Sequence, residues 1–449
     1  MKDSIRARYA EERLPRYTSY PTAPHFTGAV SARRYDKWLA SLPAAPASLY
    51  LHIPFCRSMC WYCGCHTTVA RRDRPILDYL AALRREIELV ADRLTQPLPV
   101  RQIHFGGGTP TILAPVDFAG LVRLLRQRFP LERDAEIAVE IDPRTLAPAM
   151  IGAFGEAGVT RANLGVQSFD VQVQEAINRR QGFEQTAAAV TALRAAGIDS
   201  IGFDLIYGLP HQTVRSCLET VEACVALRPG RIAVFGYAHL PGFKKHQRKI
   251  DEAALPGGSA RHDQAEAIAE ALMAAGYRRI GIDHFALPGD RLAEASAKGA
   301  LHRNFQGYTT DSAETLIGFG ASAIGRLPQG YVQNETVLGA YAERVQRGEL
   351  ATARGYRLTA EDRLRGELIE RLMCDFEVDV AAICARHGAA PAELMRSANR
   401  LEALAADGIV QVEGSVVRLA DDSHFLARTV ASAFDAHLGA RPGGFSRAV

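Results

Sequence analysis

The feature that most constrains the fold is a regular alternation of short apolar runs with helical patterns. Six runs end at Gly, Pro or polar clusters, and they span residues 48–53, 100–105, 136–141, 161–166, 201–207 and 231–237. Between the first two, Ile76, Leu80 and Leu83 begin a series at steps of four and three, which predicts an amphipathic helix. Such long connections exclude hairpins, so the strands are predicted to be parallel.

Six βα units predict an α/β fold in which helices cover a parallel sheet, either curled into a barrel or doubly wound. We expect a further strand at residues 277–285. Beyond about residue 355 the chain becomes helical and charged, and two runs at 409–412 and 416–419 predict a hairpin in a winged-helix-like module. The predicted domains are therefore an N-terminal arm (1–45), a large α/β domain (46–350) and a smaller, mainly helical C-terminal domain (351–449).

The composition is that of a globular chain. Hydrophobic residues make up 47% and charged residues 23% of the 449 positions, which excludes disordered and fibrous classes. The formal net charge is +3, too small a surplus to favour a nucleic-acid partner. No secretory signal is found in the first twenty residues, and no run of eighteen apolar residues predicts a membrane span. We therefore expect a cytoplasmic protein.

Four of the eight cysteines fall within ten residues, directly after the first predicted strand. Cys56, Cys60 and Cys63 form the pattern CxxxCxxC, and Cys65 follows two residues later. In a reducing cytosol such thiols are expected to bind metal or to react. Three thiolates suit three corners of a 4Fe-4S cluster, and the fourth iron stays open to a ligand. The alternatives are a structural zinc site that includes Cys65 or His66, and buried thiols.

Glycine and polar residues stand at the ends of the later predicted strands. The turn GGGTP at residues 106–110 exposes consecutive N–H groups that suit a carboxylate, and it is neither GxGxxG nor a P-loop. The polar residues at the following strand ends are Glu140, Asp142, Gln167, Ser168, Asp204 and His239. Because parallel strands present their carboxyl ends at one edge, we expect these side chains at one site.

The cysteine loop, the GGGTP turn and the six βα units together resemble the radical S-adenosylmethionine (SAM) enzymes. Longer strings are similar to the oxygen-independent coproporphyrinogen III oxidases: RYTSYPT (16–22), HIPFCRSMCWYCGC (52–65), IYGLP (206–210), YAHLP (237–241), LHRNFQGYTT (301–310) and FSR (445–447). The resemblance covers nearly the whole chain. It implies a partial (β/α)6 radical SAM barrel with a smaller, mainly helical C-terminal domain.

The resemblance also implies an activity: oxidative decarboxylation, without oxygen, of two propionate side chains of coproporphyrinogen III to vinyl groups. The product is protoporphyrinogen IX, and the oxidant is a 5′-deoxyadenosyl radical from SAM. It implies a cytoplasmic monomer of porphyrin and haem biosynthesis that takes electrons from a donor such as flavodoxin or ferredoxin. The alternatives are a haem chaperone and a radical SAM enzyme acting on another tetrapyrrole. The chaperones typically lack both the RYTSYPT segment and the cysteine at the position of Cys65.

The same resemblance assigns site residues. Cys56, Cys60 and Cys63 match the cluster ligands, and Cys65 matches a cysteine that is needed for activity but does not bind the cluster. Two SAM molecules are implied. The residues that match contacts to the first are Tyr50, Gly107, Glu140 and Ile324. Those that match contacts to the second are Tyr62, Gly108, Thr109, Gln167, Arg179, Asp204 and Ala238.

A substrate with four propionates requires cations in its pocket. The candidates are Arg6, Arg8, Arg13 and Arg16 near the start, and Lys244, Lys245, Arg248 and Lys249 after the sixth strand. From the sequence alone these residues cannot be separated from solvated surface charges. The remaining cysteines are predicted to be buried and unpaired: Cys217, Cys224, Cys374 and Cys384.

Overall fold

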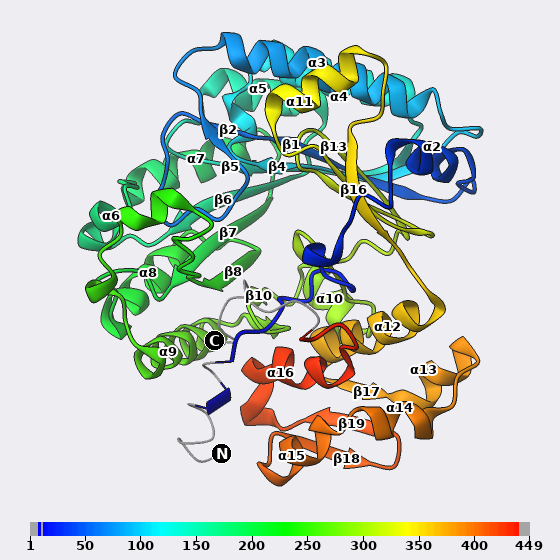
Figure 1. Cartoon of the computed structure of the whole chain (residues 1–449). Helices are drawn as coiled ribbons and strands as arrows, with labels where there is room; N and C mark the ends of the chain where they lie inside the picture. Colours follow the sequence, from blue (N-terminus) through cyan, green and yellow to red (C-terminus); the bar gives the residue numbers. More distant parts are fainter. Residues whose placement is uncertain (1–7, 10–11, 440–449) are drawn as a thin grey trace.

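The computed structural model describes residues 8–9 and 12–439, and its centre is a run of six parallel strands in a 12-stranded sheet (Figure 1). In spatial order these are β1 (Ala47–Ile53), β4 (Val100–Gly107), β5 (Leu131–Ile141), β6 (Arg161–Gln167), β7 (Ser200–Tyr207) and β8 (Arg231–Gly236). Each strand is parallel to the next, as predicted. The spatial order follows the chain order without the reversal of a doubly wound sheet, so the fold is a partial barrel.

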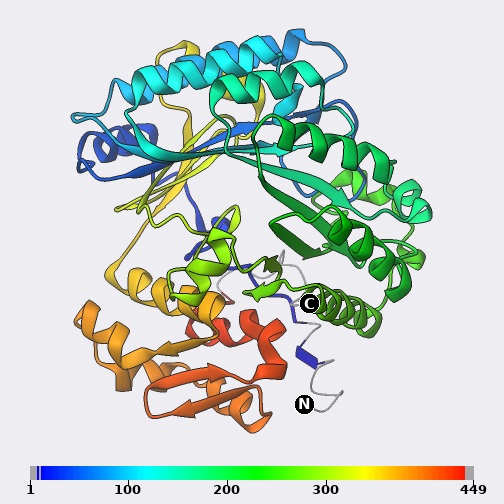
Figure 2. The same cartoon turned by 180° about the vertical axis from the view of Figure 1, so that it is seen from behind.

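The crossover helices cover the outer face of the curved sheet (Figures 1 and 2). They are α3 (Arg74–Ala91), α4 (Pro115–Arg128), α5 (Pro148–Ala157), α6 (Val171–Ala176), α7 (Phe183–Ala195), α8 (Val214–Ala226) and α9 (Gly258–Ala274). Apolar side chains fill the space between helices and sheet. The rings of Phe105 on β4 and Phe154 on α5 lie 4.9 and 5.1 Å from that of Phe118 on α4, and all three are fully buried. Each such ring buries a large apolar area, which stabilises the layer.

Both edges of the barrel are extended. Beside β1 lies a seventh parallel strand, β13 (Thr315–Phe319), followed by the antiparallel strands β14 (Ile324–Leu327), β15 (Gly330–Asn334) and β16 (Thr352–Arg357). β16 lies beyond the boundary expected at residue 350 and still belongs to the large sheet. The expected strand at 277–285 is wrong as a single strand. It is a hairpin of β9 (Arg278–Ile280) and β10 (His284–Ala286), because Gly281, with φ +56°, reverses the chain.

The C-terminal domain has its own apolar core beneath the barrel (Figure 1). Its elements are α12 (Ala360–Asp375), β17 (Glu377–Asp379), α13 (Val380–His387), α14 (Pro391–Ser397), α15 (Arg400–Ala406), β18 (Val410–Glu413), β19 (Val416–Leu419) and α16 (Ala427–Ala431). β18 and β19 form the predicted hairpin. Tyr17 and Tyr20 of the N-terminal arm belong to this core, and the Tyr17 hydroxyl donates to Asp435 at 3.0 Å. The arm thus ties the C-terminal domain to the barrel.

The remaining elements are short or lie at the edges. They are η1 (Ala23–His25), α2 (Ala32–Ala40), β2 (Phe55–Cys56), β3 (Thr68–Val69), η2 (Pro110–Ile112), η3 (Lys245–Lys249), η4 (Glu252–Ala254), α10 (Arg291–Ala297), β11 (His302–Asn304), β12 (Gly307–Thr309), α11 (Leu338–Gln346), η5 (Asp421–Leu426) and η6 (Ser432–Phe434). Within the described part of the chain, no helix has the length and apolar character needed to cross a membrane. The four scattered cysteines are buried and unpaired, as predicted. Arg6 and the FSR string lie outside the described residues.

Candidate active site

The cysteine loop crosses the carboxyl end of the barrel directly after β1. Its two ends are held together because β2 and β3 pair in parallel, and the Ala70 N–H donates to the Cys56 carbonyl at 3.0 Å. The η3 segment supports the loop from the other side. Its His246 ring contacts the Cys63 carbonyl at 2.7 Å, and Gln247 donates to the Tyr62 carbonyl at 3.0 Å. The loop is therefore positioned by elements on both sides of the barrel mouth.

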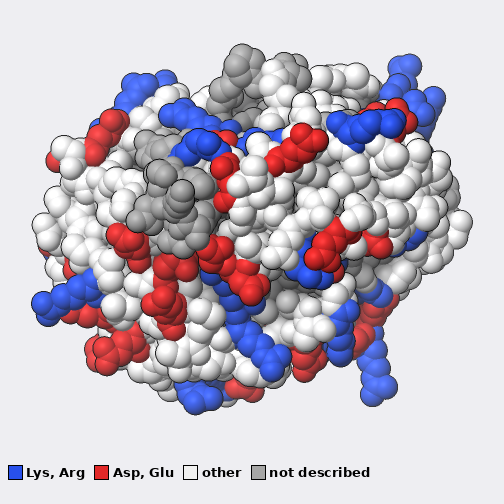
Figure 3. Space-filling model, turned by 90° about the horizontal axis from the view of Figure 1, so that it is seen from below, with Lys and Arg blue, Asp and Glu red and all other residues white. Residues whose placement is uncertain are grey.

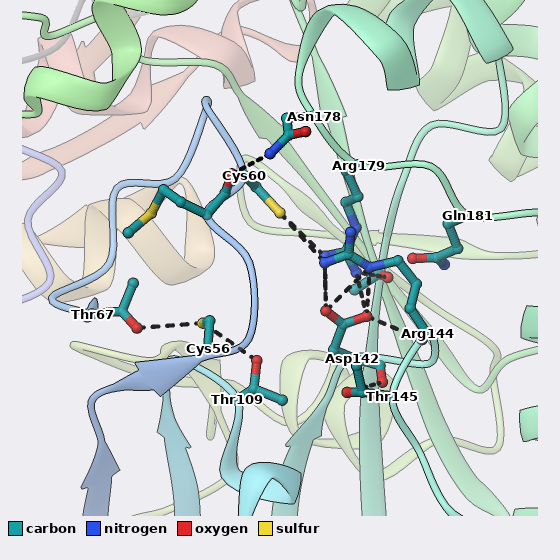
Figure 4. Close-up of polar contacts among 12 residues, drawn as sticks. Cys56, Cys60, Thr67, Thr109, Asp142, Arg144, Thr145, Asn178, Arg179 and Gln181 are labelled. Atoms are coloured by element: carbon teal, nitrogen blue, oxygen red, sulfur yellow. Dashed lines mark hydrogen bonds and ion pairs between the residues drawn. The ribbon is translucent and has the colours of Figure 1, made fainter. Parts of the chain in front are cut away.

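Hydrogen-bond donors surround two of the three predicted ligand sulfurs (Figure 4). Arg144 Nη2 and Arg179 Nη1 each lie 3.6 Å from the Cys60 Sγ. Both guanidinium groups also pair with Asp142, at 2.6 and 3.4 Å, which fixes their direction. Nearby guanidinium groups stabilise a thiolate over a thiol.

Cys56 has neutral donors instead. Its Sγ lies 3.3 Å from the Thr67 Oγ1 and 3.4 Å from the Thr109 Oγ1 (Figure 4). Burial raises the pKa of the Cys56 thiol, and these two hydroxyls oppose that rise. The sequence predicted Thr109 as a site residue but missed Thr67 and Arg144, which no motif marks.

The chemistry of this donor set fits an iron–sulfur cluster. Thiolates are the usual ligands of such clusters, and hydrogen bonds to their sulfurs set the reduction potential. Across residues 8–9 and 12–439, no three His, Cys, Asp or Glu side chains are gathered as the ligands of one metal ion. Three thiols in one loop, with donors from the turns after β4 and β5 and from the segment before α7, fit such a cluster.

A cavity of about 260 Å³ lies beside the loop. It is lined by Tyr50, Gly107, Glu140 and Ile324, the four residues that the resemblance assigned to the first SAM, and also by Cys65. These side chains come from β1, β4, β5 and β14, so only the folded sheet brings them together. Cys65 is exposed on this cavity. Phe305 and Gln306 also line this cavity, although neither was predicted as a site residue.

Glu140 faces this cavity as a carboxylate. Burial by itself raises the pKa of Glu140, but His104, 3.1 Å away, and the Gly107 N–H, at 3.2 Å, hold it below its usual value. Gly107 has φ +112°, and a Cβ there would lie 2.8 Å from the His52 ring. A Cβ on Gly108 would lie 2.6 Å from the Phe55 carbonyl oxygen. The GGGTP turn therefore needs glycine for its conformation and its close packing.

Four residues assigned to the second SAM lie at or just after the carboxyl ends of β4, β6 and β8: Gly108, Thr109, Gln167 and Ala238. Asp204 lies within β7, Tyr62 in the cysteine loop and Arg179 between α6 and α7. Arg179 donates to the Gly165 carbonyl at 2.7 Å, and Asp204 accepts from the Asn163 amide at 2.8 Å. Burial raises the pKa of Asp204 to about 6. Ala238 lines a second, larger cavity of about 590 Å³. The structure therefore spreads these residues over the barrel mouth instead of gathering them in the small cavity.

The predicted substrate cations separate into two groups. Arg13 and Arg16 line the larger cavity. Arg8 instead pairs with Asp407, Lys244 donates to the Cys65 carbonyl at 2.9 Å, and Lys249 lies over the Trp61 ring at 5.5 Å. Four other arginines line this cavity and were not predicted, because they are scattered along the chain: Arg261, Arg279, Arg303 and Arg428.

Two family models match two separate parts of the chain. The model of the Radical SAM superfamily matches residues 50–224, and that of the HemN C-terminal domain matches residues 358–422. A relative from Bradyrhizobium diazoefficiens named oxygen-independent coproporphyrinogen III oxidase is 60% identical over 450 residues, covering 100% of each chain. One of the same name from Paracoccus denitrificans is 44% identical over 429 residues, covering 95% of each.

A solved structure gives the same result in three dimensions. Coproporphyrinogen III oxidase (HemN) from Escherichia coli, described as a radical SAM enzyme, superposes with a TM-score of 0.90 at 38% identity. The match covers 95% of this chain and 100% of that one. The chain belongs to the oxygen-independent coproporphyrinogen III oxidase family of radical SAM enzymes.

Proposed function

We propose that this protein decarboxylates two propionate side chains of coproporphyrinogen III to vinyl groups without oxygen, giving protoporphyrinogen IX. The observation that carries this proposal is the cavity beside the cysteine loop. It brings Tyr50, Gly107, Glu140 and Ile324 together at the carboxyl end of a six-stranded parallel barrel. The chain is also 60% identical, over its full length, to a relative named for this activity.

Cys56, Cys60 and Cys63 would hold a 4Fe-4S cluster at the barrel mouth. When bound, the cluster and SAM supply a 5′-deoxyadenosyl radical, which can break an unactivated C–H bond where side-chain acids and bases cannot. Arg144 and Arg179 direct hydrogen bonds at the Cys60 sulfur. Asp142 pairs with both guanidinium groups, which orients them and compensates part of their positive charge.

The lining of the small cavity suits the first SAM. The ionised Glu140 attracts the positive charges of this cofactor, and Tyr50 and Ile324 supply apolar walls. Cys65 exposes its thiol to the same cavity, and we propose that it serves turnover without binding the cluster. Because Glu140 already accepts hydrogen bonds from His104 and Gly107, its carboxylate is held in place before the cofactor binds.

We further propose a second SAM, contacted by Tyr62, Gly108, Thr109, Gln167, Arg179, Asp204 and Ala238. Support comes from the position of Gly108, Thr109, Gln167 and Ala238 at or just after the carboxyl ends of β4, β6 and β8. Equilibrium binding of labelled SAM to the cluster-loaded protein should give two molecules per chain, and a value of one would contradict this. The family resemblance supports three finer statements: a monomer, a cytoplasmic location, and reduced flavodoxin or ferredoxin as electron donor.

The decisive test of the reaction is anaerobic. The reconstituted protein is mixed with a reductant, SAM and coproporphyrinogen III, and the products are analysed for vinyl tetrapyrroles and 5′-deoxyadenosine. We expect protoporphyrinogen IX together with two molecules of 5′-deoxyadenosine per product. A mixture without SAM is the control. Unchanged coproporphyrinogen III together with retention of added haem would overturn the proposal in favour of a haem chaperone.

A further inference from the structure

The η3 segment joins the cysteine loop to the end of β8. It follows that strand in the chain, and its His246 ring lies 2.7 Å from the Cys63 carbonyl. The Gln247 side chain reaches both parts, because its amide nitrogen donates to the Tyr62 carbonyl at 3.0 Å and to the Ala238 carbonyl at 3.2 Å. Tyr62 and Ala238 are two of the residues proposed above to contact the second SAM. One side chain therefore connects two parts of that proposed site.

Both ends of the Gln247 amide are used. While the nitrogen donates to the two carbonyls, the oxygen accepts from the Leu240 N–H at 2.6 Å. Because one partner is an N–H and the other two are carbonyls, only one orientation of the amide satisfies all three. An ionised glutamate of the same size could accept from Leu240 but could donate to neither carbonyl. The position therefore requires an amide.

Gln247 is buried, with only 1% of the residue exposed. By contrast, charged side chains of both signs are interspersed on the face of the molecule shown in Figure 3, where water competes with their contacts. Water does not reach the Gln247 amide to replace its hydrogen bonds, so their loss is costly. Without these donors the cysteine loop would lose its connection to the end of β8.

The side chain of Tyr62 is held by the same part of the chain. It packs against an apolar cluster that includes Tyr237, the neighbour of Ala238, and Ile250, which directly follows η3. Apolar contacts thus position the Tyr62 ring, while the hydrogen bond from Gln247 positions its backbone. Both supports come from the segment between the end of β8 and residue 250.

We propose, building on the second SAM of the proposed function, that Gln247 is a positioning residue of that site. It fixes the backbone of Tyr62 relative to Ala238, and it acts through these two residues without touching a reacting atom. A contact surface that is ordered in advance lowers the cost of ordering it on binding. Loss of the Gln247 donors should therefore weaken the second SAM. It should spare the first, because the residues that line the small cavity come from other segments.

The test measures equilibrium binding of labelled SAM to the cluster-loaded protein under anaerobic conditions. No reductant is added, so that no turnover occurs. Glu140→Gln identifies which dissociation constant belongs to the first SAM, since Glu140 lines the small cavity. Gln247→Glu keeps the size of the side chain and removes both donated hydrogen bonds. We expect it to raise Kd of the second SAM at least about tenfold and to leave Kd of the first unchanged.

Gln264→Glu is the matched control. Gln264 on α9 is also 1% exposed, accepts from the Gly208 N–H at 2.9 Å and donates to the Gln212 carbonyl at 2.8 Å. The same substitution is thus made in a buried amide that does not bond to the cysteine loop, and both SAM constants should stay at their wild-type values. If either variant fails to fold, Gln247→Met and Gln264→Met remove the hydrogen bonds without burying a charge.

A kinetic readout separates positioning from general damage. With reductant and coproporphyrinogen III present, Gln247→Glu should raise KM for SAM about tenfold and change kcat little, because saturating SAM fills the weakened site. The visible absorbance of its cluster should equal that of wild type. A distorted barrel mouth would instead lower both the cluster content and kcat.

Three outcomes would overturn the inference: unchanged SAM constants in a folded Gln247 variant, equal weakening of both SAM molecules, or loss of the cluster. Binding of a single SAM by wild type would overturn it together with the second site. Failure of the proposed function is a distinct result. In that case Kd of the second SAM still rises in Gln247→Glu, but wild type forms no vinyl product from coproporphyrinogen III.

Discussion

The cysteine loop and the arginine cavity, the larger cavity lined by six arginines, are assembled in different ways. At the loop, Arg144 and Arg179 donate to the Cys60 sulfur, and two threonine hydroxyls contact Cys56. The six arginines of the cavity come from distant segments of the chain. The loop is therefore encoded locally, whereas the cavity exists only in the folded chain.

This difference indicates two kinds of binding site. A site whose counter-charges are built into the fold is preorganised for a resident cofactor. A cavity assembled from distant segments depends on the tertiary fold instead. The variants below test the loop, and then a buried carboxyl group on α3.

The largest expected effect is that of Cys56→Ser. Replacing one of the three predicted thiolate ligands should abolish the visible absorbance of the reconstituted cluster and all product formation. Absorbance spectra and the anaerobic activity assay measure both. Cys217→Ser is the matched control, because Cys217 is a buried residue of α8 and burial raises its pKa to about 12. Retention of the cluster in Cys56→Ser would mean that Cys56 is not a cluster ligand.

Cys65→Ser should separate cluster binding from turnover. Because Cys65 lies on the small cavity, we expect this variant to keep most of the cluster absorbance and to lose turnover. The measurement is the ratio of product formed to cluster bound, with Cys217→Ser again as the control. A loss of absorbance as complete as that of Cys56→Ser would make Cys65 a ligand.

A smaller effect is expected of Arg144→Gln, which removes one charged donor from the Cys60 sulfur. Reduction adds negative charge, so the variant should lower the reduction potential of the cluster by an amount on the order of 60 mV. Redox titration followed by electron paramagnetic resonance measures the shift. Arg180→Gln is the control, since Arg180 is 79% exposed and pairs with Glu175. Equal potentials in the three proteins would show that the guanidinium does not compensate the thiolate.

Glu86 on α3 is a buried group of a different kind, because all three of its hydrogen-bond donors are neutral. It is 2% exposed and accepts hydrogen bonds from Tyr341, the Gly320 N–H and Asn334 at 2.7, 2.7 and 2.6 Å. Burial raises the pKa of Glu86 from 4.5 to about 7, and the three donors only partly offset that rise. The partners of Glu86 are thus all neutral donors, whereas the Cys60 sulfur has two guanidinium donors.

The smallest predicted effect follows from that pKa. The folded protein binds the Glu86 proton more tightly than the unfolded chain, so the contribution to stability is full below pH 4.5 and is lost as the pH rises through about 7. The unfolding free energy of wild type minus that of Glu86→Gln should fall by an amount on the order of 3 kcal/mol across this range.

Urea unfolding of both proteins at several pH values measures this difference. Glu88→Gln, a half-exposed neighbour on the same helix that pairs with Arg85, is the matched control and should show no such slope. A difference that is flat or rises with pH would mean that folding does not raise the pKa of Glu86.

Much of the fold was predictable because it is encoded locally. The six strand runs, the helix after β1 and the hairpin of β18 and β19 each follow from periodicity within a short segment. The strand expected at 277–285 was wrong because Gly281 turns the chain where the apolar pattern continues. β13 was missed, since its pairing with β1 joins residues that are far apart in the sequence.

The two sites differ in the same way: one is encoded locally, and the other depends on the tertiary structure. The sequence by itself determined the cysteine loop, because three ligands of one cluster must lie within the reach of one short segment. Periodicity left barrel and doubly wound sheet open, and the strand order in three dimensions decided for the barrel. Only the tertiary structure revealed the arginine cavity, since Arg16, Arg261, Arg303 and Arg428 come from four distant segments. Electrostatic recognition acts through space, and spacing along the chain carries no record of it.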